Sequence, residues 1–124
     1  MEPLGNQGPE EEYILLRPYE LMVILDSRLN DSDSDGIITR VLDLVRKDGN
    51  VGRIDRWGRR KLAYEINKVS EGNYSIIEFA STPATVTEIS RILSISDGVL
   101  RHKIIRLPER IAGRVLAKEA LAQE

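Results

Sequence analysis

The sequence predicts an α+β domain in which four antiparallel strands form one sheet and two helices cover one of its faces. Four segments are rich in β-branched and apolar residues without helical spacing, whereas two others carry apolar residues at helical spacing. These segments follow one another as strand, helix, strand, strand, helix, strand. This order contains two strand–helix–strand halves, and two such halves can interleave into a single sheet.

The first half begins with a buried strand and continues into a helix. Residues 19–25 form an apolar run that ends at Asp26, as expected for a central strand buried on both faces. After a stretch rich in Asp and Ser, apolar residues recur at helical spacing and basic residues precede Gly49. This pattern predicts a helix over about 33–48, with Gly49 as its C′ residue.

A long hairpin is predicted next. Leu62, Tyr64 and Ile66 alternate near the end of a strand over 51–66. Within this strand, Gly52 and Gly58 indicate bulges or bends. Residues 67–73 are expected to form the turn, and residues 74–80 the returning strand.

The second half ends with a helix and a last strand. Thr82 is the expected N-cap and Pro83 the first helical residue, and the helix is expected to end before Asp97. Residues 99–107 are expected to form the last strand. Together the elements predict a ferredoxin-like, or split βαβ, sandwich: a four-stranded antiparallel sheet with both helices on one face and its other face uncovered.

The charge of the chain is unevenly distributed. The 124 residues have a formal net charge of −2, but residues 17–108, the predicted domain, carry 15 basic and 13 acidic residues. Residues 1–16 carry four Glu and no basic residue, and we expect a disordered acidic extension or a true start at Leu16. Residues 109–124 are balanced in charge and predict a marginal helical tail.

Several function classes are disfavoured. Without cysteine and with His102 as the single histidine, thiol catalysis, Fe–S clusters and Cys-type zinc sites are excluded. His102 lies between two basic residues with no triad partner at a suitable spacing, so we expect an exposed or RNA-facing side chain and no enzyme. No cofactor, metal or small-molecule substrate is expected. No run approaches the roughly 20 apolar residues of a membrane span, and no signal peptide is recognisable, so a cytoplasmic protein is expected.

The run Asp31–Gly36 matches the opening of a calcium-binding EF-hand loop. The twelfth position of that loop requires a bidentate Glu, but Leu42 stands there. A strand is also predicted where an EF-hand has its entering helix. We therefore expect these carboxylates and hydroxyls to cap a helix and to complement its dipole.

The segment Arg53–Lys61 gives the strongest functional signal, with five basic residues, one acidic residue and Trp57. This composition suits phosphate neutralisation and stacking on an unpaired base. The alternative is a solvated edge strand that its charges protect from aggregation. Trp57 and the consecutive charges at 59–61 favour contact with a nucleic acid or another anionic partner. Arg101, Lys103 and Arg106 add a second cationic line on the last strand.

RNA-recognition domains that stack bases share this topology, and they carry aromatic residues on the first and third strands. Here the first strand, 21–25, and the third, 72–79, do not place aromatic residues in that register. Base stacking on the uncovered face is therefore disfavoured, and this face is free to meet a protein.

Five ordered blocks carry a family resemblance. They are Arg17-Pro18-Tyr19-Glu20, Val45–Gly49, Trp57–Ile66, Glu71–Tyr74 and Val99-Leu100-Arg101. In order and spacing they are similar to the bacterial small-subunit ribosomal protein six family, over about residues 17–107. That family usually begins with a methionine where this chain has Leu16.

The resemblance implies a non-catalytic constituent of the small ribosomal subunit that binds the central domain of 16S ribosomal RNA together with ribosomal protein eighteen. It implies phosphate contacts by Arg17, Arg59, Arg60, Arg101 and Arg106, to which Lys61 and Lys103 are added on charge alone. Trp57, Leu62 and Tyr64 are expected to support the core or the protein partner. A weakly basic domain should bind RNA cooperatively with a more basic partner. The alternative is a free-standing single-stranded nucleic-acid or small-ligand binding module on the same fold.

Overall fold

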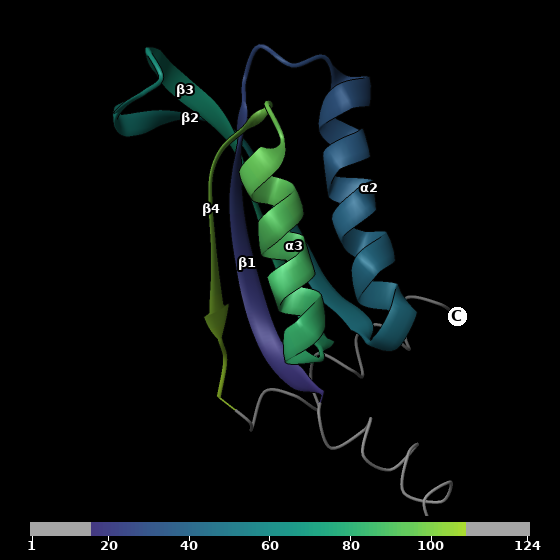
Figure 1. Cartoon of the computed structure of the whole chain (residues 1–124). Helices are drawn as coiled ribbons and strands as arrows, with labels where there is room; N and C mark the ends of the chain where they lie inside the picture. Colours follow the sequence, from purple (N-terminus) through teal and green to yellow (C-terminus); the bar gives the residue numbers. More distant parts are fainter. Residues whose placement is uncertain (1–15, 109–124) are drawn as a thin grey trace, which may run out of the picture.

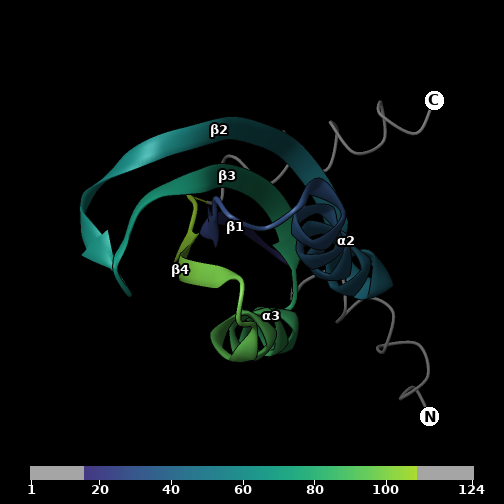
Figure 2. The same cartoon turned by 90° about the horizontal axis from the view of Figure 1, so that it is seen from above.

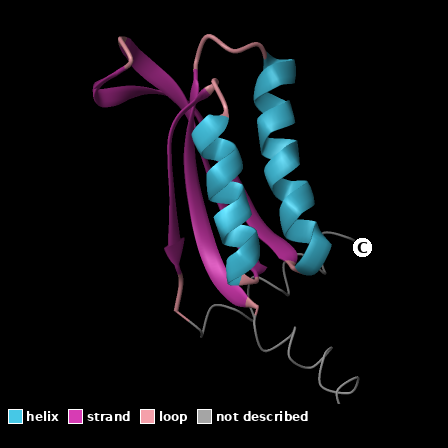
Figure 3. Cartoon of the chain, viewed as in Figure 1, coloured by secondary structure: helices cyan, strands magenta, loops and turns pink. Residues whose placement is uncertain are grey.

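The computed structural model describes residues 16–108, which form one antiparallel sheet with the strand order β2-β3-β1-β4. Figures 1 and 3 show both helices on the same face of this sheet. This arrangement confirms the predicted ferredoxin-like α+β fold. The expectations about an acidic extension and a C-terminal tail concern residues 1–15 and 109–124, outside the described residues. The elements are β1 (Arg17–Asp26), α2 (Asp31–Asp48), β2 (Asn50–Ile66), β3 (Val69–Ser81), α3 (Pro83–Ile95) and β4 (Val99–Arg106).

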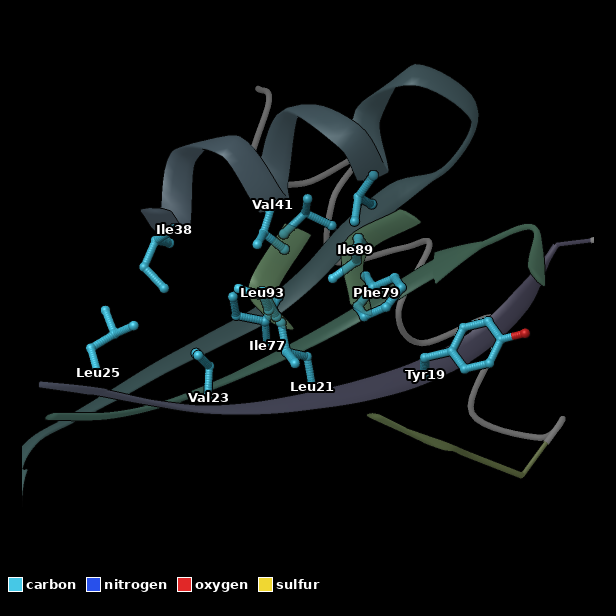
Figure 4. Close-up of a cluster of buried hydrophobic side chains, with 12 residues drawn as sticks. Tyr19, Leu21, Val23, Leu25, Ile38, Val41, Ile77, Phe79, Ile89 and Leu93 are labelled. Carbon is cyan, nitrogen blue, oxygen red and sulfur yellow. The ribbon is translucent and has the colours of Figure 1, made fainter. Parts of the chain in front are cut away.

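The hydrophobic core lies between the sheet and the two helices, as Figure 4 shows. Alternate residues of β1 point into it, and the rings of Tyr19 and Phe79 stack there with their centroids 5.6 Å apart. Because side chains alternate along a strand, the even-numbered residues of β1 face the other side of the sheet. We call that side the uncovered face. The core comprises Tyr19, Leu21, Val23, Leu25, Ile38, Val41, Val45, Val51, Ile77, Phe79, Ile89 and Leu93.

Helix α2 begins two residues before its predicted start. Asn30 is its N-cap, and the Asn30 Oδ1 accepts a hydrogen bond of 2.7 Å from the Asp33 N–H. Asp31 and Asp33 lie in the first turn, where carboxylates interact favourably with the helix dipole. The acidic run therefore belongs to a helix start that follows strand β1, as the capping interpretation expects. In the described part of the chain, no three His, Cys, Asp or Glu side chains cluster as a metal site would require.

Gly49 ends α2 as its C-cap, in an extended conformation with φ −151°, and not as the C′ residue that was predicted. A Cβ atom at Gly49 would lie 1.9 Å from the carbonyl oxygen of Ala80. The glycine is needed because β3 passes close to the backbone at this point, and not because the turn requires a positive φ.

The turn between β2 and β3 has two residues, Asn67 and Lys68, with φ values of 53° and 65°. The predicted seven-residue turn over 67–73 is therefore wrong. Gly72 resembled a turn signal, but it lies within β3, where a Cβ atom would come within 2.5 Å of Ile24 Cγ2. Close packing against β1 explains this glycine.

The hairpin of β2 and β3 bends strongly along its length. Its pairing shifts in register near Gly52 and near Gly58, where bulges were predicted, and Gly58 has φ 82°. Figure 2 shows the far half of the hairpin curving around the sheet on the side away from the helices. Strand β2, which carries the predicted cationic segment, is an edge strand. Neither described helix is long and apolar enough to cross a membrane.

Candidate functional site

A hollow of about 270 Å³ lies between the curved hairpin and the uncovered face of the sheet. Ile24 of β1 is paired with Tyr74 on one side and with Arg101 on the other, so all three side chains point to this face. Met22 and Lys103 are paired in the same way. We call this hollow the hairpin bowl, and it is lined by Met22, Ile24, Leu62, Ala63, Tyr64, Ile66, Tyr74, Arg101 and Lys103.

Two large aromatic side chains are exposed around the bowl. Tyr64 is 61% exposed, and its hydroxyl accepts a hydrogen bond from the Arg101 guanidinium. Trp57 is 50% exposed and stacks on Tyr74, with ring centroids 6.4 Å apart and planes at 13°. The Arg60 guanidinium lies 5.7 Å from the Trp57 ring centre, a cation–π geometry. The bowl therefore combines an apolar floor with aromatic and cationic walls, a surface suited to an anionic or amphipathic partner.

The three predicted protein-partner residues differ in exposure. Trp57 and Tyr64 are available at the surface, whereas Leu62 is only 7% exposed. Leu62 lines the bowl from the hairpin side. It supports the shape of the bowl and offers little surface of its own.

Three of the predicted RNA-contacting residues lie on the far half of the hairpin. Arg59 pairs with Asn73 across the hairpin and Arg60 pairs with Gly72, so their side chains point to opposite faces. Arg59 lies 3.8 Å from a carboxylate oxygen of Glu71, and both side chains remain about half exposed. Lys61 is exposed as well. The positive charges at 59–61 therefore lie on both faces of the hairpin, as their consecutive positions indicate.

The predicted second cationic line on β4 is divided between the two faces of the sheet. Arg101 and Lys103 point to the uncovered face, because they are paired with Ile24 and Met22. Arg106 is paired with Tyr19, whose ring lies in the core, so Arg106 belongs to the helix-covered face. Residues an odd number of positions apart on a strand lie on opposite faces, and Lys103 and Arg106 are three positions apart. The three cations therefore lie on the last strand, as predicted, but they do not share one face of the sheet.

The seven predicted cations thus divide between two ends of the sheet. Arg17 is paired with Ser81 and Arg106 with Tyr19, at the amino end of β1. The five others lie on the far half of the hairpin or line the bowl. Arg101 and Arg106 are five residues apart on β4, which corresponds to about 17 Å along the strand.

Two residues that the sequence analysis did not single out shape this region. Arg56 forms an ion pair of 2.8 Å with Asp35, and this pair links β2 to the first turns of α2. Tyr74 lies on the uncovered face beneath Trp57. Its face could have been predicted, because Tyr74 is an odd number of positions from the core residues Ile77 and Phe79. As expected, β1 presents no aromatic residue to this face, but β3 presents Tyr74, so the expectation that neither strand places an aromatic residue there is wrong for the third strand.

The His102 side chain is partly buried, and it lies on the opposite face of the sheet from its basic neighbours Arg101 and Lys103. It points toward α3, and its Nε2 lies 3.1 Å from the Ser90 hydroxyl oxygen. Partial burial lowers the pKa of His102 below its ordinary value. The expectation of an exposed side chain is wrong, because strand alternation turns His102 away from Arg101 and Lys103 and toward α3.

Comparison with known proteins assigns the chain to a family. The family described as Ribosomal protein S6 matches residues 18–106. The chain belongs to the ribosomal protein S6 family. This membership confirms the resemblance that the five sequence blocks carry.

Relatives and a solved structure agree with the assignment to ribosomal protein S6. The chain is 48% identical over 92 residues to small ribosomal subunit protein bS6 of Mycobacterium leprae, covering 73% of this chain and 96% of that protein. It is 46% identical over 93 residues to the corresponding protein of Corynebacterium efficiens, covering 74% and 98%. The crystal structure of 30S ribosomal protein S6 from Thermotoga maritima is similar with a TM-score of 0.69 at 27% identity, covering 88% and 99%.

Family membership places the chain in the bacterial small ribosomal subunit, and hence in the cytoplasm. Its relatives are structural ribosomal proteins, so the chain is not an enzyme.

Proposed function

We propose that this member of the ribosomal protein S6 family binds 16S ribosomal RNA of the small subunit together with ribosomal protein eighteen. The observation that carries the proposal is the bowl itself, where cations and exposed aromatic side chains meet on the sheet face that neither of the two described helices covers. Cations neutralise phosphates, and exposed aromatic residues are enriched at protein interfaces. One surface thus offers groups for both partners.

The RNA is assigned to the basic residues. Arg59, Arg60 and Lys61 project from the far half of the hairpin, and Arg101 and Lys103 line the bowl beneath it. Arg17 and Arg106 form a second contact region at the amino end of β1. An RNA that reaches both regions extends over at least about 17 Å of the sheet.

The protein partner is assigned to the aromatic residues of the bowl. Trp57 and Tyr64 are large side chains with half or more of their surface exposed, which is the type of residue that dominates binding energy at interfaces. Leu62 contributes by holding the hairpin over the apolar floor. A partner that covers these side chains removes apolar surface from water and places its own charges beside the RNA.

Charge reversal on the hairpin tests the RNA assignment. The double variant Arg59→Glu with Arg60→Glu is expected to weaken binding of a central-domain 16S fragment, measured with protein eighteen present, by about tenfold or more. The dependence of affinity on salt concentration should also become shallower, because fewer counterions are released. Both side chains are exposed, so the fold should persist.

The control reverses the same number of charges elsewhere. Arg40→Glu with Arg91→Glu changes two exposed arginines on the helices, away from the bowl. This variant should retain most of the affinity. Equal loss in both double variants would indicate a general charge effect and would refute the assignment, as would unchanged affinity and salt dependence in the hairpin variant.

A further inference from the structure

A second groove, separate from the hairpin bowl, lies along β4 at the edge of the sheet. In the described part of the chain, β4 pairs with β1 alone, and α3 lies beside it, as Figures 1 and 2 show. The groove between α3 and β4 has a volume of about 530 Å³. We call it the α3–β4 groove, and it is lined by Val86, Thr87, Ser90, Arg91, Ser94, His102, Lys103 and Ile104.

The groove is formed by one face of α3 and by the adjoining part of β4. The polar residues of α3 that line it recur three and four positions apart, so they share one face of the helix. On the strand, the His102 Nε2 lies 3.1 Å from the Ser90 hydroxyl oxygen, and Ile104 is paired with the core residue Leu21. Lys103 directs its side chain to the opposite face, so the groove meets the main chain of β4 there.

The main chain of β4 presents hydrogen-bonding groups to this groove. The Leu107 N–H donates a hydrogen bond of 2.9 Å to the Pro18 carbonyl oxygen, so these two residues form a hydrogen-bonded pair of the β1–β4 ladder. In an antiparallel ladder, hydrogen-bonded and non-hydrogen-bonded pairs alternate. The register therefore turns the N–H and C=O groups of Lys103 toward β1, and those of His102 and Ile104 outward to the groove.

The edge formed by β4 is positively charged. Arg101 and Lys103 lie two positions apart on the uncovered face, and β4 contains no acidic residue. On the groove side, Arg91 binds Glu88 at 2.7 Å, so the excess of positive charge lies on the uncovered face. An added strand alternates its side chains between the same two faces, and opposite charges on neighbouring strands attract. Acidic side chains at every second position are therefore complementary to this edge.

A second copy of this chain and an RNA are poorer occupants. Pairing of β4 with another β4 would bring basic side chains opposite one another, which is unfavourable. Phosphate oxygens only accept hydrogen bonds, so they offer no donor to the outward carbonyl groups of His102 and Ile104. A peptide main chain supplies both donors and acceptors, at the spacing of a strand.

We propose that β4 and the α3–β4 groove bind an extended acidic segment of another protein, which adds to the sheet beside β4. Its main chain pairs with His102 and Ile104. Its acidic side chains lie beside Arg101 and Lys103, and the side chains between them enter the groove. This strand addition goes beyond the proposed function. Its test requires neither 16S RNA nor protein eighteen, so either proposal can fail without the other.

NMR titration of the full chain with a short synthetic peptide tests the strand addition. The probe is a capped peptide of alternating Glu and Thr residues. It should shift the backbone amide signals of Ser90, His102 and Ile104, and it should slow hydrogen exchange of the His102 and Ile104 amides, which become hydrogen-bonded. The same peptide with Lys in place of Glu should bind about fivefold more weakly or worse. An absence of these shifts with the acidic peptide would overturn the proposal.

Two variants of His102 isolate the main-chain contribution. His102→Ala and His102→Pro both remove the imidazole, but only proline also removes the outward N–H. Proline is tolerated in an edge strand where the N–H points away from the ladder. His102→Pro should bind the acidic peptide about tenfold more weakly than His102→Ala. Equal affinity would show that the peptide does not pair with β4. If His102→Pro does not fold, unchanged amide exchange in the unmodified chain on peptide binding gives the same contradiction.

A charge reversal tests the acidic character of the segment. Lys103 is exposed, and Lys103→Glu should weaken binding of the acidic peptide by about fivefold and strengthen binding of the Lys peptide. Arg40→Glu, at an exposed position on α2, is the matched control and should change neither affinity. Equal losses in both variants would refute a specific contact at β4. If a short oligouridylate shifts the Ser90 and Ile104 signals and the acidic peptide does not, the groove binds RNA and the proposal is wrong.

Discussion

At the scale of single residues, close approach of neighbouring groups determines where this chain carries glycine. Gly49 meets the carbonyl oxygen of Ala80, and Gly72 meets the Ile24 side chain and the Leu25 carbonyl oxygen. Gly36, in contrast, lies within α2 with no atom within 4 Å of the place a Cβ would take. A methyl group added at these positions should therefore change the free energy of unfolding by different amounts.

Gly49→Ala is expected to destabilise the protein by about 3 kcal/mol, because the new Cβ would overlap a backbone oxygen that cannot move without displacing β3. Gly36→Ala should instead stabilise it by about 0.5–1 kcal/mol, because alanine favours a helix interior. Urea unfolding of both variants measures the two effects. A small effect of Gly49→Ala would show that β3 does not pass as close to residue 49 as the structure places it.

The pKa of His102 predicts how stability depends on pH. Burial lowers this pKa in the folded state below the ordinary value of 6.5, so the unfolded chain binds more protons near that pH. The free energy of unfolding should therefore be highest above about pH 6.5 and should decrease as the pH falls through the folded-state pKa. Urea unfolding at about pH 7.5 and about pH 5 measures the decrease in the free energy of unfolding. The decrease should be smaller in the variant His102→Gln. If the free energy of unfolding decreases equally in the variant, titratable groups other than His102 cause the decrease.

The sequence was sufficient to find the cations of the candidate site and two of its aromatic residues, Trp57 and Tyr64, but it neither sorted the cations by face nor identified the apolar floor of the bowl. Arg101, Lys103 and Arg106 were grouped by their positive charge, although strand alternation separates them. The bowl could not be predicted, because it forms only where the curved hairpin brings Tyr64 over Arg101, residues far apart in the sequence.

At the scale of elements, the hairpin of β2 and β3 combines irregular features that together give its curvature. Two-residue hairpin turns with positive φ at both residues match the twist of the strands they connect, and Asn67 and Lys68 adopt this geometry. Register shifts near Gly52 and Gly58 bend the strands further. The ion pair of Arg56 with Asp35 fixes the bent hairpin to α2. The bowl depends on this curvature.

Lys68→Gly is expected to stabilise the protein by roughly 0.5–1 kcal/mol, because Lys68 has φ 65° and glycine adopts that conformation without steric cost. Lys68→Val should destabilise it, since a β-branched residue is poorly tolerated at positive φ. Thermal unfolding of both variants measures the difference. The same stability for the two variants would contradict the two-residue turn.

The six elements could be predicted from residue patterns. Some of their boundaries were predicted wrongly, because the same residue types occur in turns, at caps and at sites of close packing. The turn was extended to Asn73 because Gly72 and Asn73 are typical turn residues, although here Gly72 relieves packing against Ile24. The start of α2 was set too late because its N-cap, Asn30, precedes a run of aspartates that can all serve as caps. Thr82 and Pro83 gave an unambiguous start for α3, and the structure confirms it.

At the scale of the whole molecule, charge is distributed between surfaces with different roles. Residues 17–108 carry only two more basic than acidic residues, and ion pairs such as Arg28–Asp26 and Arg53–Asp55 engage several of the arginines. The bowl, in contrast, has no carboxylate among the described residues that line it. A protein with so little excess charge should bind RNA weakly alone, and a partner docked on Trp57 and Tyr64 would supply additional contacts.

The most direct test of the proposed function is the affinity of the full chain for a central-domain 16S fragment, measured with and without ribosomal protein eighteen. We expect the partner to increase the affinity by about tenfold or more. Tyr64→Ala should lose most of this increase, whereas Ile95→Ala, which removes a similarly exposed apolar side chain at the end of α3, should retain it. Tight binding that is the same with and without the partner would contradict the account and would favour a free-standing nucleic-acid binding module.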